Sequence, residues 1–150
     1  INTHRMLCAN PAMLAAGCSS DTIGPSDITV ADLVGTWTIT KIEYTKDGSP
    51  NTHVDLIADK GISGTAVVNA NGSYTITETV APVTQTITGN FTVQNNTIVD
   101  TQTGQAANDL SVTRTGDTLT FTDESVTYDF DNNSTTAEEN ADLVMVWKKQ

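Results

Sequence analysis

Three charged residues share a face with apolar residues in segments where polar and apolar side chains alternate. They are Glu78, Arg114 and Asp123. Alternation of this kind is typical of a strand with one buried face, so all three charges are predicted to point inward. A buried, unpaired charge is costly, so each of them must pair, reach water or line a polar pocket. Either they anchor a ligand, or Arg114 and Asp123 lie near strand ends and reach solvent.

Aromatic side chains on the same faces supply apolar walls for such a pocket. Small-molecule pockets typically combine apolar walls with a few placed polar groups. The candidate ligand-binding residues are therefore Trp37, Tyr74, Glu78, Phe91, Arg114, Phe121, Asp123 and Trp147.

A different cluster has the ligand types that Ca²⁺ prefers. Asp129, Asp131 and Asn133 alternate along the sequence, as the first ligands of a calcium loop do. The sixth position of that loop, normally glycine, is Ser134, and the twelfth, normally glutamate, is Asn140. We therefore expect a solvated acidic turn, with a calcium site as the alternative, and no cofactor.

Common catalytic motifs are absent from the sequence. It contains no G-x-S-x-G, no P-loop and no dinucleotide-binding fingerprint. His53 is the only histidine after the first twenty residues, and nothing in the sequence supports a Ser-His-Asp triad built on it. Aromatic residues make up only 5% of the chain, which is few for a glycosidase that must stack sugars. These observations predict a protein that is not an enzyme.

The charge of the chain excludes two classes of partner. Lys and Arg total 7 against 18 Asp and Glu, for a net charge of −11. Phosphates would be repelled, so nucleic-acid binding and attachment through a basic membrane patch are not expected. No apolar run approaches the roughly 18–20 residues of a membrane-spanning helix.

The elements that must position these residues are strands. Threonine accounts for 27 of the 150 residues, and its β-branched side chain favours strands. From Val30 onward the pattern has period two, and turn signals at Asn71-Gly72, Asn95-Asn96 and Gly116-Asp117 predict two-residue hairpins. Residues 51–60 are predicted to be a loop or a short helix, and most threonines are predicted to face solvent.

This pattern predicts an all-β fold of about eight or nine strands in one domain. Strands joined by hairpins form an antiparallel up-and-down meander, and closing it into a barrel removes the exposed edges. Eight strands enclose room for side chains or one small ligand. In the first strand, Trp37 and Ile39 have one parity and Ile42 and Tyr44 the other, which predicts a β-bulge near Lys41.

The first residues have a different character. Leu14-Ala15-Ala16-Gly17 precede Cys18, and a polar stretch follows. This order resembles a bacterial lipoprotein signal peptide, in which small residues fit the peptidase and the cysteine thiol accepts a diacylglyceryl group. The resemblance implies a leader over residues 1–17, a lipidated Cys18 with a polar tether over 18–30, and a barrel over 31–150. The alternatives are an inert tail and a disulfide between Cys8 and Cys18.

Gly35-Thr36-Trp37 forms the G-x-W pattern of lipocalins. Together with the cysteine and tether before it, this first strand resembles bacterial lipocalin-like lipoproteins. The resemblance implies an eight-stranded lipocalin-like barrel in which Gly35 allows close approach of the chain and Trp37 fills the closed end. It also implies a basic residue over Trp37, for which Arg114 and Lys148 are the candidates.

The expected function follows from these features together. We expect a non-enzymatic lipoprotein of the bacterial cell envelope, on the outer membrane or cell surface, that touches the membrane only through its lipid. Its barrel is expected to bind a small apolar or amphipathic molecule. The alternative is a structural or interaction module with a filled barrel, contacting a protein or glycan through threonine-rich faces or the loops at 51–60 and 131–140. A cavity of roughly 300 Å³ or more favours the first.

Overall fold

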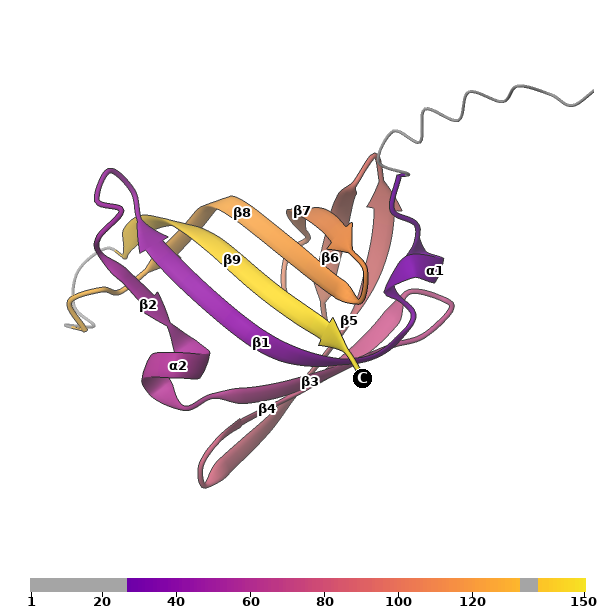
Figure 1. The fold of residues 1–150 in the computed structure, drawn as a ribbon, viewed down its shortest axis with the longest axis horizontal. Helices are drawn as coiled ribbons and strands as arrows, with labels where there is room; N and C mark the ends of the chain where they lie inside the picture. Colours follow the sequence, from indigo (N-terminus) through magenta and orange to yellow (C-terminus); the bar gives the residue numbers. More distant parts are fainter. Residues whose placement is uncertain (1–26, 133–137) are drawn as a thin grey trace, which may run out of the picture.

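An eight-stranded, closed antiparallel β-barrel is the main feature of the chain, as predicted (Figure 1). The computed structural model describes residues 27–132 and 138–150. Each barrel strand pairs with the next one along the chain, and β1 pairs with β9 to close the barrel. The barrel strands are β1 (Gly35–Lys46), β3 (Ser63–Val68), β4 (Ser73–Val80), β5 (Val83–Gln94), β6 (Thr97–Gln102), β7 (Asn108–Thr115), β8 (Thr118–Tyr128) and β9 (Glu139–Lys149).

An extra strand and a short helix occupy the segment predicted as a loop or helix. Strand β2 (His53–Asp55) pairs with the second half of β1, where β3 has already turned away. Helix α2 (Leu56–Lys60) follows directly. Asp55 caps this helix by accepting a hydrogen bond from Ile57 N at 2.9 Å, and the same carboxylate oxygen accepts one from Ile42 N at 3.4 Å. Asp55 thus ties the helix to the barrel wall.

The predicted bulge in the first strand is confirmed. Ile39 lies opposite Trp147, whereas Lys41 lies opposite Val146, so one extra residue is inserted in β1. The insertion changes which residues of the strand face inward. Trp37 and Ile39 are buried before it, and Ile42, which has the opposite parity, is buried after it. A second register shift lies within β8, between Asp123 and Val126.

Two of the three predicted two-residue hairpins are confirmed. Asn95 and Asn96 both have positive φ, as a type I′ turn requires, and Gly116-Asp117 joins β7 to β8. The Asn71-Gly72 prediction is wrong in detail. Asn69 N donates to Ser73 O at 2.8 Å, so the loop has three residues and ends in a glycine bulge.

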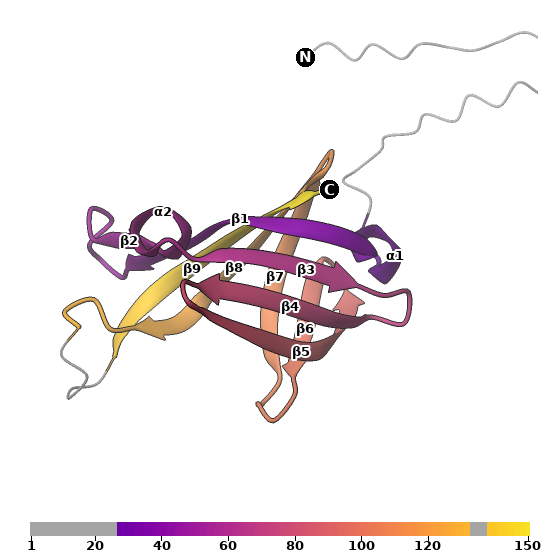
Figure 2. The ribbon, with the colours of Figure 1, turned by 90° about the horizontal axis from the view of Figure 1, so that it is seen from below.

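One end of the barrel is closed by a packed core. Helix α1 (Val30–Leu33) lies at this end, opposite the end that carries α2 (Figure 2). The indole Nε1 of Trp37 donates a hydrogen bond to Leu33 O at 2.8 Å, which fixes α1 against the barrel. The largest fully buried side chains are Trp37, Trp147, Phe121, Leu33, Ile98, Leu119 and Val112.

The basic residue over Trp37 is Lys149, neither Arg114 nor Lys148. Lys149 Nζ lies 5.3 Å from the centroid of the Trp37 ring, and the two residues are opposite each other across β1 and β9. Lys148 has the outward parity of β9, and Arg114 forms an ion pair with Asp32. Gly35 has a φ of +137°, where other residues are strained, and a Cβ there would lie 3.2 Å from Lys149 Cε.

We expect Trp37→Phe to lower the free energy of unfolding by about 1–3 kcal/mol more than Trp147→Phe does. Both substitutions shrink a buried ring, but only the first leaves a buried carbonyl, that of Leu33, without its donor, since Trp147 Nε1 has no hydrogen-bond partner among the described residues. Denaturant titrations of the two variants measure the difference. Equal losses would show that the Trp37 hydrogen bond does not stabilise the closed end.

Candidate functional site

A cavity of about 270 Å³ lies inside the barrel, between the packed end and the end that carries α2. Its walls combine apolar and aromatic side chains with a few polar ones. The lining residues include Ile39, Ile42, Tyr44, Leu56, Tyr74, Ile76, Glu78, Phe91, Asp100, Gln102, Asn108, Leu110, Phe121, Leu143, Met145 and Trp147. The volume is slightly below the roughly 300 Å³ at which ligand pockets usually begin, so volume alone does not decide between a ligand site and a filled barrel.

Five of the eight residues predicted from sequence line this cavity: Tyr74, Glu78, Phe91, Phe121 and Trp147. The aromatic ones form its floor. The Tyr74 and Phe91 rings stack at 4.3 Å between centroids, and Phe121 and Trp147 lie 4.6 Å apart. Phe91 lies 6.3 Å from Trp147 and joins the two pairs. The sequence pattern therefore located one continuous aromatic surface.

The other three predicted residues lie elsewhere. Trp37 is buried in the closed end and does not line the cavity. Arg114 is exposed near the end of β7, where its Nη1 lies 2.9 Å from Asp32 Oδ1, because strand parity no longer determines burial in the last residues of a strand. Asp123 is buried and accepts hydrogen bonds from Asn108 Nδ2 at 2.8 Å and Ser125 N at 2.9 Å. Its partners satisfy it within the barrel wall.

The remaining predicted sites lie wholly or partly beyond the described residues. Cys8, Cys18 and Asn133 belong to that part of the chain. Asp129 and Asp131 follow β8, and no group of three or more His, Cys, Asp or Glu side chains within residues 27–132 and 138–150 is arranged to hold a metal ion.

Asp100 is the polar residue of the cavity that the sequence reasoning missed. It is 8% exposed, and its Oδ1 accepts a hydrogen bond from Tyr74 Oη at 2.7 Å. Burial raises the pKa of Asp100 above its usual range, although hydrogen bonds from Tyr74 and Gln102 act in the opposite direction. Burial likewise raises the pKa of Tyr74. The adjacent apolar residues Ile98 and Val99 left the parity of this strand ambiguous.

Gly89 allows the pair of Tyr74 and Asp100 to form. A Cβ at position 89 would lie 2.5 Å from Tyr74 Oη and 2.6 Å from Tyr74 Cζ. The phenol ring therefore lies directly over the backbone of Gly89, which pairs with Tyr74 across β4 and β5. Any larger residue at this position would push the hydroxyl away from Asp100.

Acidic groups also characterise the end of the cavity near α2. Glu78 is half-buried, and its Oε2 accepts a hydrogen bond from Gln85 Nε2 at 2.8 Å. Tyr44 stacks on Tyr128 at 4.6 Å. Burial raises the pKa of Tyr44, and the nearby Tyr128, Glu78 and Asp123 raise it further. Among the described residues, the lining of the cavity thus includes two carboxylates and no Lys or Arg.

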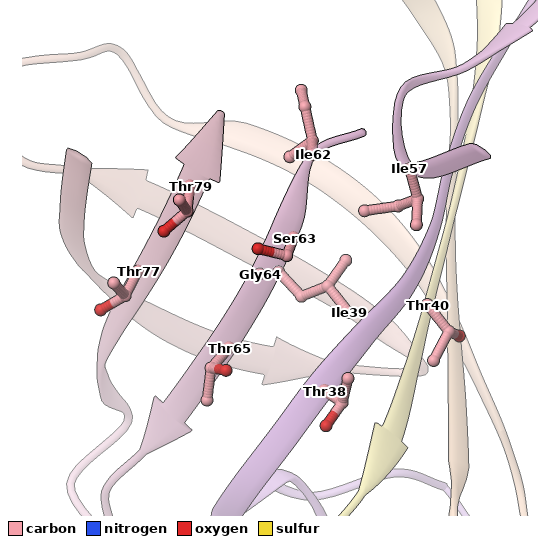
Figure 3. A pocket seen from close by; sticks show the side chains of 10 residues that line it. All are labelled: Thr38, Ile39, Thr40, Ile57, Ile62, Ser63, Gly64, Thr65, Thr77 and Thr79. Carbon is pink, nitrogen blue, oxygen red and sulfur yellow. The ribbon is translucent and has the colours of Figure 1, made fainter. Parts of the chain in front are cut away.

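A second hollow, of about 510 Å³, lies outside the barrel beside α2 (Figure 3). Three threonines at neighbouring positions of β1, β3 and β4 line it, and they are Thr38, Thr65 and Thr77. Its apolar edge is formed by Ile57 and Ile62. The hollow has no charged or aromatic side chain among its described lining residues. Ile39 lines both this hollow and the interior cavity.

No protein-family model, curated protein or solved structure matches the chain. Within the described residues, none of the helices has the length and apolar character needed to cross a membrane.

Two carboxylates in the barrel wall are expected to give opposite pH dependence. Burial raises the pKa of Asp100 in the folded protein above the unfolded value near 3.8. The contribution of Asp100 to the free energy of unfolding therefore grows as the pH falls from the folded pKa toward the unfolded one. Burial raises the pKa of Asp123 too, but hydrogen bonds from Asn108 and Ser125 outweigh it and hold the pKa below 3.8. Its contribution is therefore present above that pH and is lost on further acidification.

We expect wild type to gain stability relative to Asp100→Asn as the pH falls from neutral toward 3.8, and to lose stability relative to Asp123→Asn below 3.8. Each unit of pKa shift corresponds to about 1.4 kcal/mol. Denaturant titrations of the three proteins across this pH range measure both differences. Profiles of the same sign would contradict the assigned environments.

Proposed function

We propose that the protein is a non-enzymatic binding protein that holds one small amphipathic molecule inside its barrel. The observation that carries this proposal is Asp100, a buried acid in the wall of a cavity whose floor is aromatic. Asp123 is a buried acid as well, but it does not line the cavity, whereas Asp100 does, so a molecule in the cavity could reach the Asp100 carboxylate. Apolar walls with a few polar groups are what small-molecule sites provide.

The hollow outside the barrel beside α2, called the outer groove from here on, supports a second function, that of an interaction module. Its threonine hydroxyls and isoleucine edge face solvent beside α2, where a protein or glycan would have access (Figure 3). The interior cavity is favoured over the groove because it joins charged, hydrogen-bonding and aromatic groups in one enclosed space. Such a combination gives more specificity than hydroxyl groups alone.

We further propose that Cys18 carries a lipid that tethers the barrel to the bacterial cell envelope. The small residues before Cys18 and the polar stretch after it support this assignment. The described fold begins at residue 27, which leaves a short polar segment between that cysteine and α1. Contact with the membrane would then be made by the lipid, with the barrel free to exchange its ligand.

A neutral fluorescent probe, 1-aminoanthracene, tests the interior site. We expect saturable binding of one probe per chain, weakened by about tenfold or more in Ile76→Trp. Ile76 lines the cavity, so the indole would occupy the space of the probe. Thr77→Trp is the matched control, because Thr77 is the next residue of β4 and lines the outer groove.

Fluorescence titration of the three proteins distinguishes the functions. Loss of binding in Thr77→Trp alone would move the site to the outer groove. Binding unaffected by either substitution, or absent in wild type, would overturn the proposal of an interior site.

Mass spectrometry tests the anchor. Full-length protein, expressed with residues 1–17 in a bacterial host, is expected to carry extra mass on the Cys18 peptide after denaturation and to fractionate with membranes. Cys18→Ser is expected to lose both properties, and Cys8→Ser to keep them. An unmodified Cys18 peptide in the wild type would refute the anchor.

A further inference from the structure

We propose that the cavity selects an organic cation: a primary amine with an aromatic body. This inference rests on the proposed function, since it names the ligand class of the same cavity. The carboxylate of Asp100 would bind the ammonium group, and the aromatic floor beside it would hold the body.

The charge of the lining residues favours a cation. Asp100 and Glu78 are the ionisable acids of the described lining, and no Lys or Arg lies among these residues to balance them. An anionic ligand would enter a space already bordered by carboxylates, with nothing to pair with its charge. The net charge of −11 adds a long-range field that draws cations toward the protein and repels anions.

The aromatic floor fits the body of such a ligand. Tyr74, Phe91, Phe121 and Trp147 form a chain of ring contacts next to Asp100. Ring faces attract cations and stack on other rings, so an aromatic amine would gain from both interactions. Tyr74 contributes twice, because it belongs to this floor and its hydroxyl orients the Asp100 carboxylate.

Three small compounds of nearly the same shape separate these contributions. Tyramine carries an ammonium group, a ring and a phenol oxygen; 4-ethylphenol lacks the charge; and 3-(4-hydroxyphenyl)propionate carries the opposite charge. Calorimetric titration of the full chain is expected to show tyramine binding at least about tenfold more tightly than 4-ethylphenol, with the propionate weakest.

Variants assign these differences to residues. Asp100→Asn keeps an acceptor for Tyr74 and is expected to weaken tyramine by about tenfold while changing 4-ethylphenol by less than about twofold. Asp142→Asn, which removes the same charge from the exposed face of β9, is the matched control and is expected to change neither.

The outcomes separate this inference from the function on which it rests. If 4-ethylphenol or the propionate binds as tightly as tyramine, the cavity is a ligand site but does not select cations, and the inference is overturned alone. The same conclusion follows if none of these compounds binds while 1-aminoanthracene does. If neither these compounds nor 1-aminoanthracene binds, both proposals fail.

Discussion

The pairing of β1 with β9 is the constraint on which the rest of the structure depends. This pairing closes the sheet and gives every barrel strand an inner and an outer face. The bulge between Ile39 and Lys41 is part of the same constraint, because without it half of β1 would turn its apolar side chains to solvent. Closure thus creates an interior that must be filled by side chains or by a bound molecule.

The two ends of the barrel fill that interior differently. At the α1 end, Trp37 packs under Lys149 and its indole N–H is hydrogen-bonded to Leu33 O. Toward α2, the interior contains the buried pair of Tyr74 and Asp100 above an aromatic floor. One end is therefore a packed core, and the other contains the cavity.

Local features of the fold could be predicted from the sequence. Features that depend on contacts between segments far apart in the sequence could not. The type I′ hairpin at Asn95-Asn96 and the bulge near Lys41 are encoded by neighbouring residues, so pattern was sufficient. Lys149 covers Trp37 because of register across the closing strands, which one strand alone does not specify.

The candidate site shows the same division. The aromatic floor followed from strand parity, which is a local property. Asp100 did not, because Ile98 and Val99 are both apolar and either face of β6 could have been the inner one. Arg114 was placed inward by parity, yet it lies at a strand end and binds Asp32. Parity is informative in the middle of a strand and loses its meaning where the strand ends.

Closure of the barrel by its first and last strands also has a consequence for the timing of folding. Thr40 Oγ1 donates to Val146 O, a residue 106 positions later, so the final contacts have a very large sequence separation. Contacts of this kind form late and slowly, since a long loop must be ordered before they contribute. A chain emerging from the ribosome therefore cannot complete its barrel until its last strand has been synthesised. Until then, the edge of β1 that will pair with β9 has no partner strand within the barrel.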